Sequence, residues 1–274
     1  MKSIRVLFAA LLIASLAVAG CGGEKKSEPA PEQAKKAVLK VGATAVPHAE
    51  ILRAIKPALE KEGVVLDIIE FSDYVQPNVA LADKELDANF FQHIPYLNKF
   101  ATERKLPLIS AVAVHIEPMG IYSKKVKNLN ELAQGASVAI PNDPTNSGRA
   151  LAVLEKAGLI KLKAGVGVNG TVQDIAENPK GLKLRELEAA QLPRVLEDVA
   201  AAVINTNYAL EAKLVPAKDA LAIEAKDSPY ANILAVRKGD ETRPEIQKLA
   251  KALTSEEVKK FIADKYQGAI LPAF

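Results

Sequence analysis

The chain has few of the residues from which disulfides and metal sites are built. Its 274 residues include one cysteine, Cys21, three histidines and no tryptophan. A single cysteine excludes an internal disulfide framework. Three histidines scattered along the sequence do not form the clustered ligand set of a metal site. We therefore predict a fold with no disulfide, no metal and no other cofactor.

Motifs of common catalytic sites are also absent from the sequence. It contains no Gly-x-Ser-x-Gly nucleophile motif, no Cys-x-x-Cys pair, no His-Glu-x-x-His helix and no phosphate-binding P-loop. These absences argue against an enzyme, and we predict that the protein is not one.

The charge of the chain is nearly balanced. Lysine and arginine number 36, aspartate and glutamate 33, and the formal net charge is +3. A nucleic-acid surface would need clustered basic residues interleaved with aromatics, and the sequence has no such stripe. We therefore predict that nucleic acid is not a partner.

The start of the chain has the pattern of a lipoprotein leader. Lys2 and Arg5 form a basic region, residues 6–19 form an apolar run too short for a permanent membrane span, and small residues precede Cys21. This pattern predicts a signal peptide at 1–20 and lipidation of Cys21. Two or more acyl chains on that residue would anchor the protein stably. The alternative is an ordinary secretory signal followed by a free thiol.

Residues 21–37 form a predicted tether, since they are rich in proline, glutamate and lysine and have no apolar periodicity. Strand and helix patterns then alternate through the first part of the globular body. We predict strands at 38–44, 64–71 and 87–91, and helices at 50–61, 75–86 and from Pro95 to about 105. Pro57 should kink its helix or delay its start. This order is typical of a parallel sheet with helices on both faces.

The middle of the chain indicates a second α/β unit. Residues 108–123 form a long extended stretch, broken by Pro118 and Gly120, that suits a strand crossing between two domains. Further strands are predicted at 137–141, 182–187, 200–205, 221–225 and 231–237, and helices at 146–157, from Leu192, and at the C-terminus. We predict two α/β lobes, 38–120 plus 229–274 and 121–228, joined by two crossover strands. Such lobes leave a cleft where small ligands bind.

Arg149 stands out in the predicted helix at 146–157. Asn146 or Thr145 is the expected N-cap, which places Arg149 in the first turn, where a cation opposes the helix dipole. A bound carboxylate would offset this charge, because free amides and a forked guanidinium would converge on it. The alternative is an arginine that leans into solvent.

Seven motifs in order give the chain a resemblance to a known family. They are FSDYVQPN (71–78), DANFFQHIPYL (87–97), MGIYS (119–123), IPNDPTNSGR (140–149), EAAQLPR (188–194), AVINTNY (202–208) and DSPYAN (227–232). The chain resembles the NlpA/MetQ family of methionine-binding lipoproteins over essentially its whole length. Gln76 and Ala231 are small departures. The resemblance implies a two-lobed, periplasmic-binding-protein-like fold that closes on its ligand and delivers it to a membrane permease.

The resemblance also implies roles for polar residues. Arg149 would clamp the α-carboxylate of the ligand, with Asn146 beside it, because a guanidinium offers a planar pair of donors that lysine lacks. Asn205 and Asn232 would be ligand-binding amides, which can satisfy a zwitterion without adding net charge. The alternatives are a helix cap for Asn205 and a loop turn for Asn232.

Four aromatic residues resemble the family's apolar pocket: Tyr74, Phe91, His93 and Tyr122. Aromatic rings suit a polarizable thioether. The alternative for His93 is a structural cap or a core histidine. His48 and His115 are taken as structural or surface residues, and Phe90 should face the core of its own lobe.

The sequence thus predicts a monomeric, lipid-anchored, extracytoplasmic solute-binding protein that captures L-methionine. Its partners would be the permease and ATPase subunits of an ABC importer, on separate chains, and the membrane through Cys21. One alternative is the same fold binding another amino acid, a methionine derivative or a Met-containing dipeptide. A second is a surface adhesin or antigen without a transport role.

Overall fold

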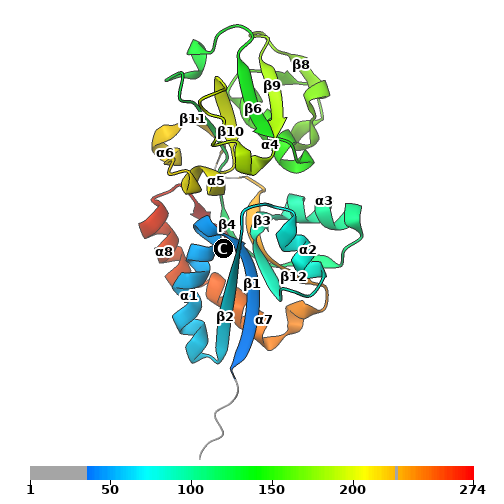
Figure 1. The fold of residues 1–274 in the computed structure, drawn as a ribbon, viewed down its shortest axis with the longest axis vertical. Coiled ribbons are helices and arrows are strands. Elements are labelled where there is room, and N and C mark those ends of the chain that lie inside the picture. Colours follow the sequence, from blue (N-terminus) through cyan, green and yellow to red (C-terminus); the bar gives the residue numbers. More distant parts are fainter. Residues whose placement is uncertain (1–35, 226–227) are drawn as a thin grey trace, which may run out of the picture. The chain divides into compact units, whose positions relative to one another are not determined.

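The computed structural model of the chain describes residues 36–225 and 228–274. The predicted signal peptide, Cys21 and nearly all of the predicted tether lie outside the described residues. Within them the strands form two main sheets and one small pair (Figure 1). Every described helix falls short of the length and apolar character that a bilayer-spanning segment requires.

The first sheet has six strands in the order β13-β4-β12-β3-β1-β2. Their bounds are β1 Ala37–Thr44, β2 Val64–Phe71, β3 Ala88–His93, β4 Leu108–Ile116, β12 Ala231–Arg237 and β13 Leu271–Pro272. β1 runs parallel to β2 and β3, but β12 runs antiparallel to β3 and β4. The three strands whose order predicted a parallel sheet do run parallel to one another, and the later strand β12 makes the sheet mixed. The chain re-enters this sheet with Asn232 opposite His93, at the end where β3 stops, so the returning strand must run the other way.

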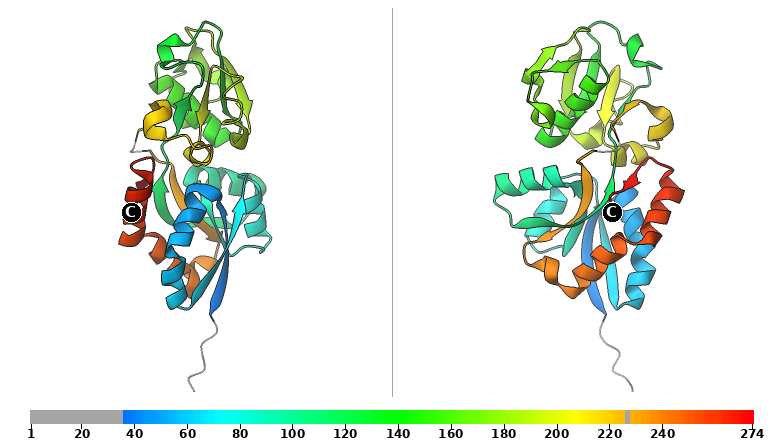
Figure 2. Two further views of the ribbon diagram at one scale, coloured as in Figure 1. Left: turned by 60° about the vertical axis from the view of Figure 1, so that its left-hand side comes forward. Right: turned by 180° about the vertical axis from the view of Figure 1, so that it is seen from behind.

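Helices cover both faces of this sheet, as predicted (Figure 2). They are α1 Glu50–Lys61, α2 Gln76–Ala82, α3 Ile94–Arg104, α7 Pro244–Leu253 and α8 Glu256–Tyr266. Leu234 and Val236 of β12 pack in the core with α1, α7 and α8, while Ile233 and Ala235 pack with α2 and α3. This alternation is that of a strand buried on both sides. Pro57 lies inside α1 on its exposed side, and the helix still begins at Glu50, so its start is not delayed.

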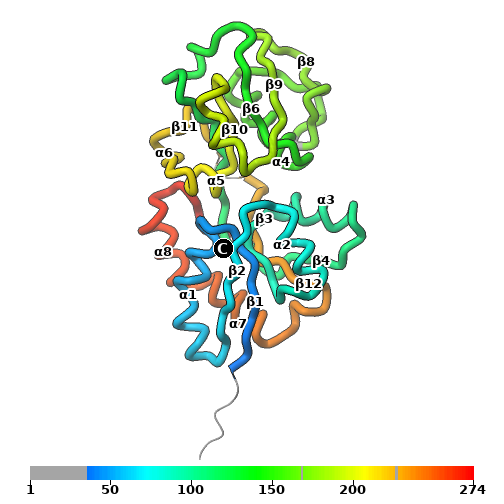
Figure 3. Tube along the Cα trace, viewed as in Figure 1, coloured from blue at the N-terminus to red at the C-terminus, as the bar shows by residue number. Residues whose placement is uncertain are grey.

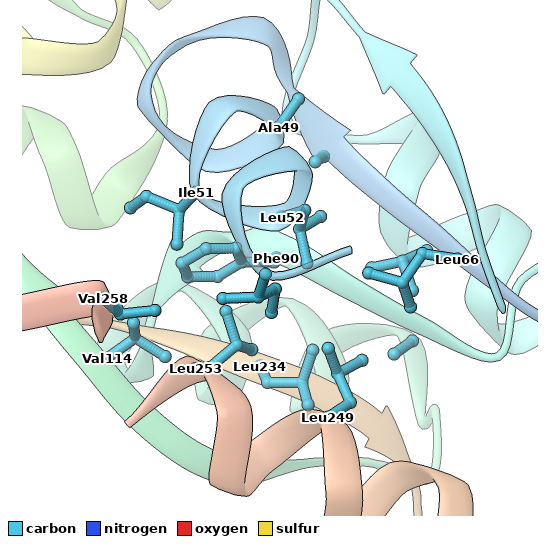
Figure 4. Close-up of a cluster of buried hydrophobic side chains, with 14 of the residues drawn as sticks. Ala49, Ile51, Leu52, Leu66, Phe90, Val114, Leu234, Leu249, Leu253 and Val258 are labelled. Atoms are coloured by element: carbon cyan, nitrogen blue, oxygen red, sulfur yellow. The ribbon is translucent and has the colours of Figure 1, made fainter. Parts of the chain in front are cut away.

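The larger core of this part of the chain joins α1 and α7 to the sheet (Figure 4). Leu52 and Leu249 are fully buried there, together with Phe90, which confirms that Phe90 faces the core. Both helices present an apolar stripe at helical spacing to the sheet. Their stability therefore comes mainly from packing rather than from intrinsic propensity.

We expect Leu249→Ala to lower the free energy of unfolding by roughly 2–5 kcal/mol, because it removes buried methyl groups and leaves a cavity. Chemical denaturation of the full chain measures this change. Lys251→Ala, an exposed position on the same helix, is the matched control and should change stability by less than about 0.5 kcal/mol. Equal effects of the two substitutions would contradict the packing described for α7.

The second sheet has the order β11-β5-β10-β6-β9. Its strands are β5 Gly120–Tyr122, β6 Ser137–Pro141, β9 Lys183–Leu187, β10 Ala201–Ile204 and β11 Ala220–Ile223; β7 Lys161–Leu162 and β8 Ile175–Glu177 form the separate pair. α4 Pro144–Lys156 packs its apolar residues into the core of this sheet, and the short helices α5 Thr206–Glu211 and α6 Pro216–Asp219 follow β10. The helix predicted from Leu192 is wrong. That segment is a series of turns, which bury Leu192, Leu196 and Val199 without a helix.

The chain passes from one sheet to the other after β4 and returns between β11 and β12 (Figure 3). The extended stretch at 108–123 is therefore two strands in different sheets, separated by residues 117–119. Gly120, which the prediction assigned to the first lobe, pairs with Ile204 in the second sheet. Functional side chains gather where these connections meet the ends of the strands.

Candidate functional site

A polar cavity collects side chains from elements of both sheets. Its lining residues are Tyr74, Phe91, Gln92, His93, Tyr96, Glu117, Asn146, Arg149, Asn205, Thr206, Asn207 and Asn232. Seven of the eight residues predicted to bind the ligand are among them, and Tyr122 is not. Segments far apart in the sequence thus converge on one site.

Tyr122 lies in the apolar core of the second sheet. Its ring packs over Gly120 and clusters with Leu192 and Leu196. Because side chains alternate along β5, this orientation turns the ring into the core. The prediction that Tyr122 lines the cavity is therefore wrong.

The start of α4 places two of the lining residues. Asp143, not Asn146 or Thr145, is the N-cap: its carboxylate accepts from the Asn146 main-chain N–H at 3.0 Å, and Pro144 is the first helical residue. Proline suits this position because its missing N–H would have no partner there. The helix therefore begins two residues earlier than predicted, and Arg149 lies in its second turn rather than in the predicted first turn. Asn146 and Arg149 lie three residues apart on its buried face.

Arg149 is buried, and its guanidinium already has an anion. Nε and Nη2 donate to the Glu224 carboxylate at 3.0 and 2.5 Å, and Nη2 also donates to the main-chain oxygen of Glu117 at 2.7 Å. The guanidinium lies over the Tyr230 ring, with its central carbon 4.2 Å from the ring centroid. We predicted that a bound carboxylate offsets the charge of Arg149. In the structure the carboxylate of Glu224, a residue of the same chain, does so. Nη1 makes no hydrogen bond with the described part of the chain.

Glu117 is the acidic group of the cavity. Its side chain is 6% exposed, and its Oε1 lies 2.7 Å from His115 Nε2 and 3.2 Å from His48 Nε2. The other nitrogen of His115 has no partner in residues 36–225 and 228–274. An orphaned buried N–H is costlier than an orphaned acceptor, so the His115 proton belongs on Nε2 and is donated to Glu117. Burial raises the pKa of Glu117, while His48, Arg149 and the Asn207 main-chain N–H oppose that rise.

His93 begins a chain of fixed hydrogen bonds that ends at Asn205. The His93 Nδ1 accepts from the main-chain N–H of Tyr96 at 3.1 Å, so its Nε2 carries the proton and donates to Asn146 Oδ1 at 3.1 Å. Asn146 Nδ2 donates to the Asp143 carboxylate, which independently fixes the same amide orientation. Asn205 Nδ2 donates to Asn146 Oδ1 at 2.9 Å. His93 is therefore both the cap of α3 and a residue of the cavity wall.

Two buried amide atoms at the site are left without a partner among the described residues. One is the acceptor Asn205 Oδ1 and the other is the donor Asn207 Nδ2, whose own Oδ1 accepts from the Tyr74 hydroxyl at 2.6 Å. Asn205 occupies the cap position of α5 but makes no side-chain cap bond, and Asn232 lies within β12 rather than in a turn. Unsatisfied buried polar atoms cost free energy unless a ligand or water pairs with them.

Aromatic rings form the apolar part of the wall. The Tyr74 ring centroid lies 5.8 Å from that of Phe91 and 5.9 Å from that of Tyr96, and the Tyr74 hydroxyl leaves the cluster towards Asn207. These offset and edge-on arrangements are the ones aromatic pairs prefer. The cavity thus combines a charged, hydrogen-bonding region with an apolar one.

His48, His115 and Glu117 are the side chains in the described residues that could hold a metal ion, with ligand atoms within 4.8 Å of one another. We predicted that the three histidines are scattered. The structure instead brings two of them, His48 and His115, together behind the cavity. Their Nε2 atoms both face the same oxygen of Glu117 at hydrogen-bonding distance. This geometry is that of a hydrogen-bonded network.

The buried position of His93 leads to a pH prediction. Burial, followed by the positive charge of Arg149, lowers the pKa of His93 to about 3, against about 6.5 in an unfolded chain. As the pH falls below 6.5 the unfolded chain takes up a proton that the folded chain does not. Stability should therefore decline by about 1.4 kcal/mol per pH unit from this residue, down to its folded pKa.

His93→Asn keeps a capping acceptor for α3 and removes the titrating group. Denaturant titrations between pH 4 and 6 should show a pH slope that is smaller than in the wild type by about 1.4 kcal/mol per pH unit. Identical slopes for the two proteins would contradict a neutral, buried His93.

Several site residues were missed by the sequence interpretation. They are Gln92, Tyr96, Glu117, Thr206 and Asn207 in the wall, with Glu224 and His48 behind it. Glu117 could have been noticed, because it is the one acidic residue in the apolar stretch 108–123. Glu224 offered no such indication, since its partner is 75 residues away in the sequence.

Comparisons with known proteins agree on one family. The family model described as NlpA lipoprotein matches residues 39–274. The D-methionine-binding lipoprotein MetQ of Salmonella typhimurium is 49% identical over 249 residues, which cover 90% of this chain and 89% of that protein.

Solved structures agree with this match. A nutrient binding protein from Burkholderia cenocepacia bound to methionine is 54% identical, with a TM-score of 0.84, and the match covers 86% of this chain and 100% of that one. An ABC transporter periplasmic substrate-binding protein from Coxiella burnetii is 46% identical, with a TM-score of 0.82 and the same coverage of 86% and 100%.

Proposed function

This chain belongs to the NlpA lipoprotein family, and on that premise we propose that it captures L-methionine outside the cytoplasm and hands it to an ABC importer. The relatives named methionine-binding lipoproteins, and the similar structure that is bound to methionine, support this function. They also support a binding protein rather than an enzyme.

The observation that carries the proposal is that one buried cavity contains both a cation and an anion, together with hydrogen-bonding atoms that have no partner among the described residues. Arg149 and Glu117 supply a cation and an anion, and Asn207 Nδ2 and Asn205 Oδ1 supply a donor and an acceptor without partners among the described residues. A free amino acid carries a carboxylate and an ammonium group, and both can be paired here. Buried charges are stable only when they are paired in this way.

The charged groups suggest how the ligand lies. Its carboxylate would bind Nη1 of Arg149, the nitrogen that Glu224 leaves unoccupied. Its ammonium group would bind the Glu117 carboxylate and Asn205 Oδ1. Its thioether would lie against Tyr74 and Phe91, where sulfur–aromatic contacts contribute about 0.3–1.5 kcal/mol each.

Contacts between connections of the two sheets would keep water out of this site. The Tyr74 hydroxyl donates to Asn207 Oδ1 at 2.6 Å, and the Tyr208 hydroxyl donates to the main-chain oxygen of Ser72 at 3.1 Å. The Tyr74 and Tyr208 rings lie 5.0 Å apart. Exclusion of water strengthens each ionic contact because the local dielectric falls.

The anchor and the partners follow from the same proposal. Cys21 would carry the lipid, and residues 22–36 would let the body move between free ligand and membrane. The permease and the ATPase would be separate chains, and the binding protein would act as a monomer. The two lobes, with Gly120 counted in the second, would be the two bodies that close on the ligand.

Uptake of labelled L-methionine by cells with and without this chain tests the transport role. Uptake at low external concentration should depend on the chain and should be competed by unlabelled L-methionine. D-methionine and a Gly-Met dipeptide belong in the same competition, since some relatives are named D-methionine-binding. Uptake that does not change when the chain is removed, in cells that make it at normal levels, would overturn the transport role and favour an adhesin or antigen.

A further inference from the structure

His48 lies directly behind the cavity and is fully buried. It sits in the segment Ala45–Ala49 that joins β1 to α1, with the Phe90 ring edge-on at 4.7 Å. Its Nδ1 is 2.7 Å from the Thr44 hydroxyl, and its Nε2 is 3.1 Å from Asn232 Oδ1. Nothing in the sequence patterns gave His48 a role in binding.

The hydrogen-bond partners of His48 fix the position of its ring proton. Nε2 lies 3.2 Å from Glu117 Oε1, which already accepts from His115. A carboxylate oxygen is an acceptor whichever way the Asn232 amide is turned, so the proton is on Nε2 and is shared between Glu117 and Asn232. Nδ1 is left as the acceptor for the Thr44 hydroxyl, which is a donor.

This tautomer decides which way the Asn232 amide faces. Its oxygen points back to His48, so its Nδ2 is the atom presented on the cavity side. Nδ2 makes no hydrogen bond with the rest of the described chain. With Asn207 Nδ2 and Arg149 Nη1, it adds to the donors that face the ligand.

We propose that His48 is a positioning residue that holds Asn232 as a hydrogen-bond donor and so makes the site selective for a ligand carboxylate over an uncharged carboxamide. His48 touches no ligand and acts only through the Asn232 amide. This inference rests on the proposed function, because it concerns the carboxylate end of the same amino acid.

His48→Met tests the donor, because methionine fills a similar space and cannot donate a hydrogen bond. Without that donor the Asn232 amide can rotate and turn its oxygen to the ligand carboxylate. The dissociation constant for L-methionine should rise roughly 10- to 100-fold, the size of one hydrogen bond to a charged group. The dissociation constant for L-methioninamide, whose carboxamide can pair with either orientation, should rise much less. His48→Gln keeps a donor at a similar reach and is the matched control, with a preference close to that of the wild type.

Asn232→Asp provides a second test that does not alter His48. The aspartate has the same shape and presents only acceptors. If Asn232 donates to the ligand, the aspartate should repel the carboxylate of L-methionine and reverse the preference towards L-methioninamide. If Asn232 instead accepted from the ligand ammonium group, the aspartate would keep or strengthen L-methionine binding.

Calorimetric titration of the full chain in detergent gives the ratio of the two dissociation constants for each variant. A rise in the dissociation constant of L-methionine relative to that of L-methioninamide, in His48→Met but not in His48→Gln, supports the inference. Equal loss of both ligands in His48→Met, or strengthened L-methionine binding in Asn232→Asp, would overturn it. A wild-type chain that binds neither ligand would instead overturn the proposed function.

Discussion

In an Arg149→Met variant we expect the affinity for L-methionine to fall by roughly two to four orders of magnitude, because the ligand carboxylate loses the cation that pairs with it in the buried site. The guanidinium is held in place by Glu224, by the Glu117 main-chain oxygen and by the Tyr230 ring, so it does not have to be ordered when the ligand binds. Preorganisation of this kind increases what a single contact contributes to affinity. Calorimetric titration measures the loss.

Stability needs its own control in this experiment, because Arg149→Met leaves the partly buried Glu224 without its cation. That cost is about 3–5 kcal/mol. The double variant Arg149→Met/Glu224→Gln should recover much of the stability and still fail to bind. Glu224→Gln alone keeps the cation and should still bind. Affinity in folded Arg149→Met close to that of the wild type would rule out the carboxylate clamp.

A Glu117→Gln variant should lose L-methionine affinity roughly 30-fold to several-thousand-fold, the range found when one partner of a buried charge pair is removed. Glutamine keeps the shape and an acceptor for His48 and His115. It removes the charge that would face the ligand ammonium group and the hydrogen bond that the carboxylate accepts from the Asn207 main-chain N–H. The effect should therefore appear in binding more than in folding.

An analogue without the ammonium group isolates this contact. The affinity for 4-(methylthio)butanoate should be similar in Glu117→Gln and in the wild type, because the analogue has no cation to pair. Glu197→Gln is the matched surface control, since Glu197 is paired with Lys124 in an exposed position, and it should leave L-methionine affinity unchanged. Equal loss of both ligands in Glu117→Gln would mean that Glu117 shapes the site rather than pairing with the ammonium group.

Local sequence patterns predicted the elements that carry the site. The apolar spacing in α1 and the strand–turn–helix at 137–151 depend on neighbours only a few residues away, so both could be read directly. The position predicted for Arg149, in the first turn of its helix, also indicated that an anion must be near, although the earlier start of α4 places Arg149 in the second turn. The sequence could not identify Glu224 as this anion, because the two residues are 75 positions apart and only the fold brings them together.

Orientation was harder to predict than position. Tyr122 lies in the expected strand but faces the core, and the sequence patterns gave no direction for β12, which runs antiparallel. The direction of each amide at the site depends on hydrogen-bond partners from distant segments, such as His48 for Asn232. Sequence shows which residues can donate or accept, and only the assembled network decides which end of an amide meets the ligand.

Native mass spectrometry of the full chain, as purified and again after unfolding and refolding, tests the central claim most directly. We predict an adduct with the mass of methionine that is lost on refolding and returns, one per chain, when L-methionine is added. Recovery with another amino acid or a dipeptide but not with L-methionine would leave the roles of Arg149 and Glu117 standing and contradict methionine as the ligand. If no zwitterionic ligand restores an adduct to the refolded chain, the account of a solute-binding site fails.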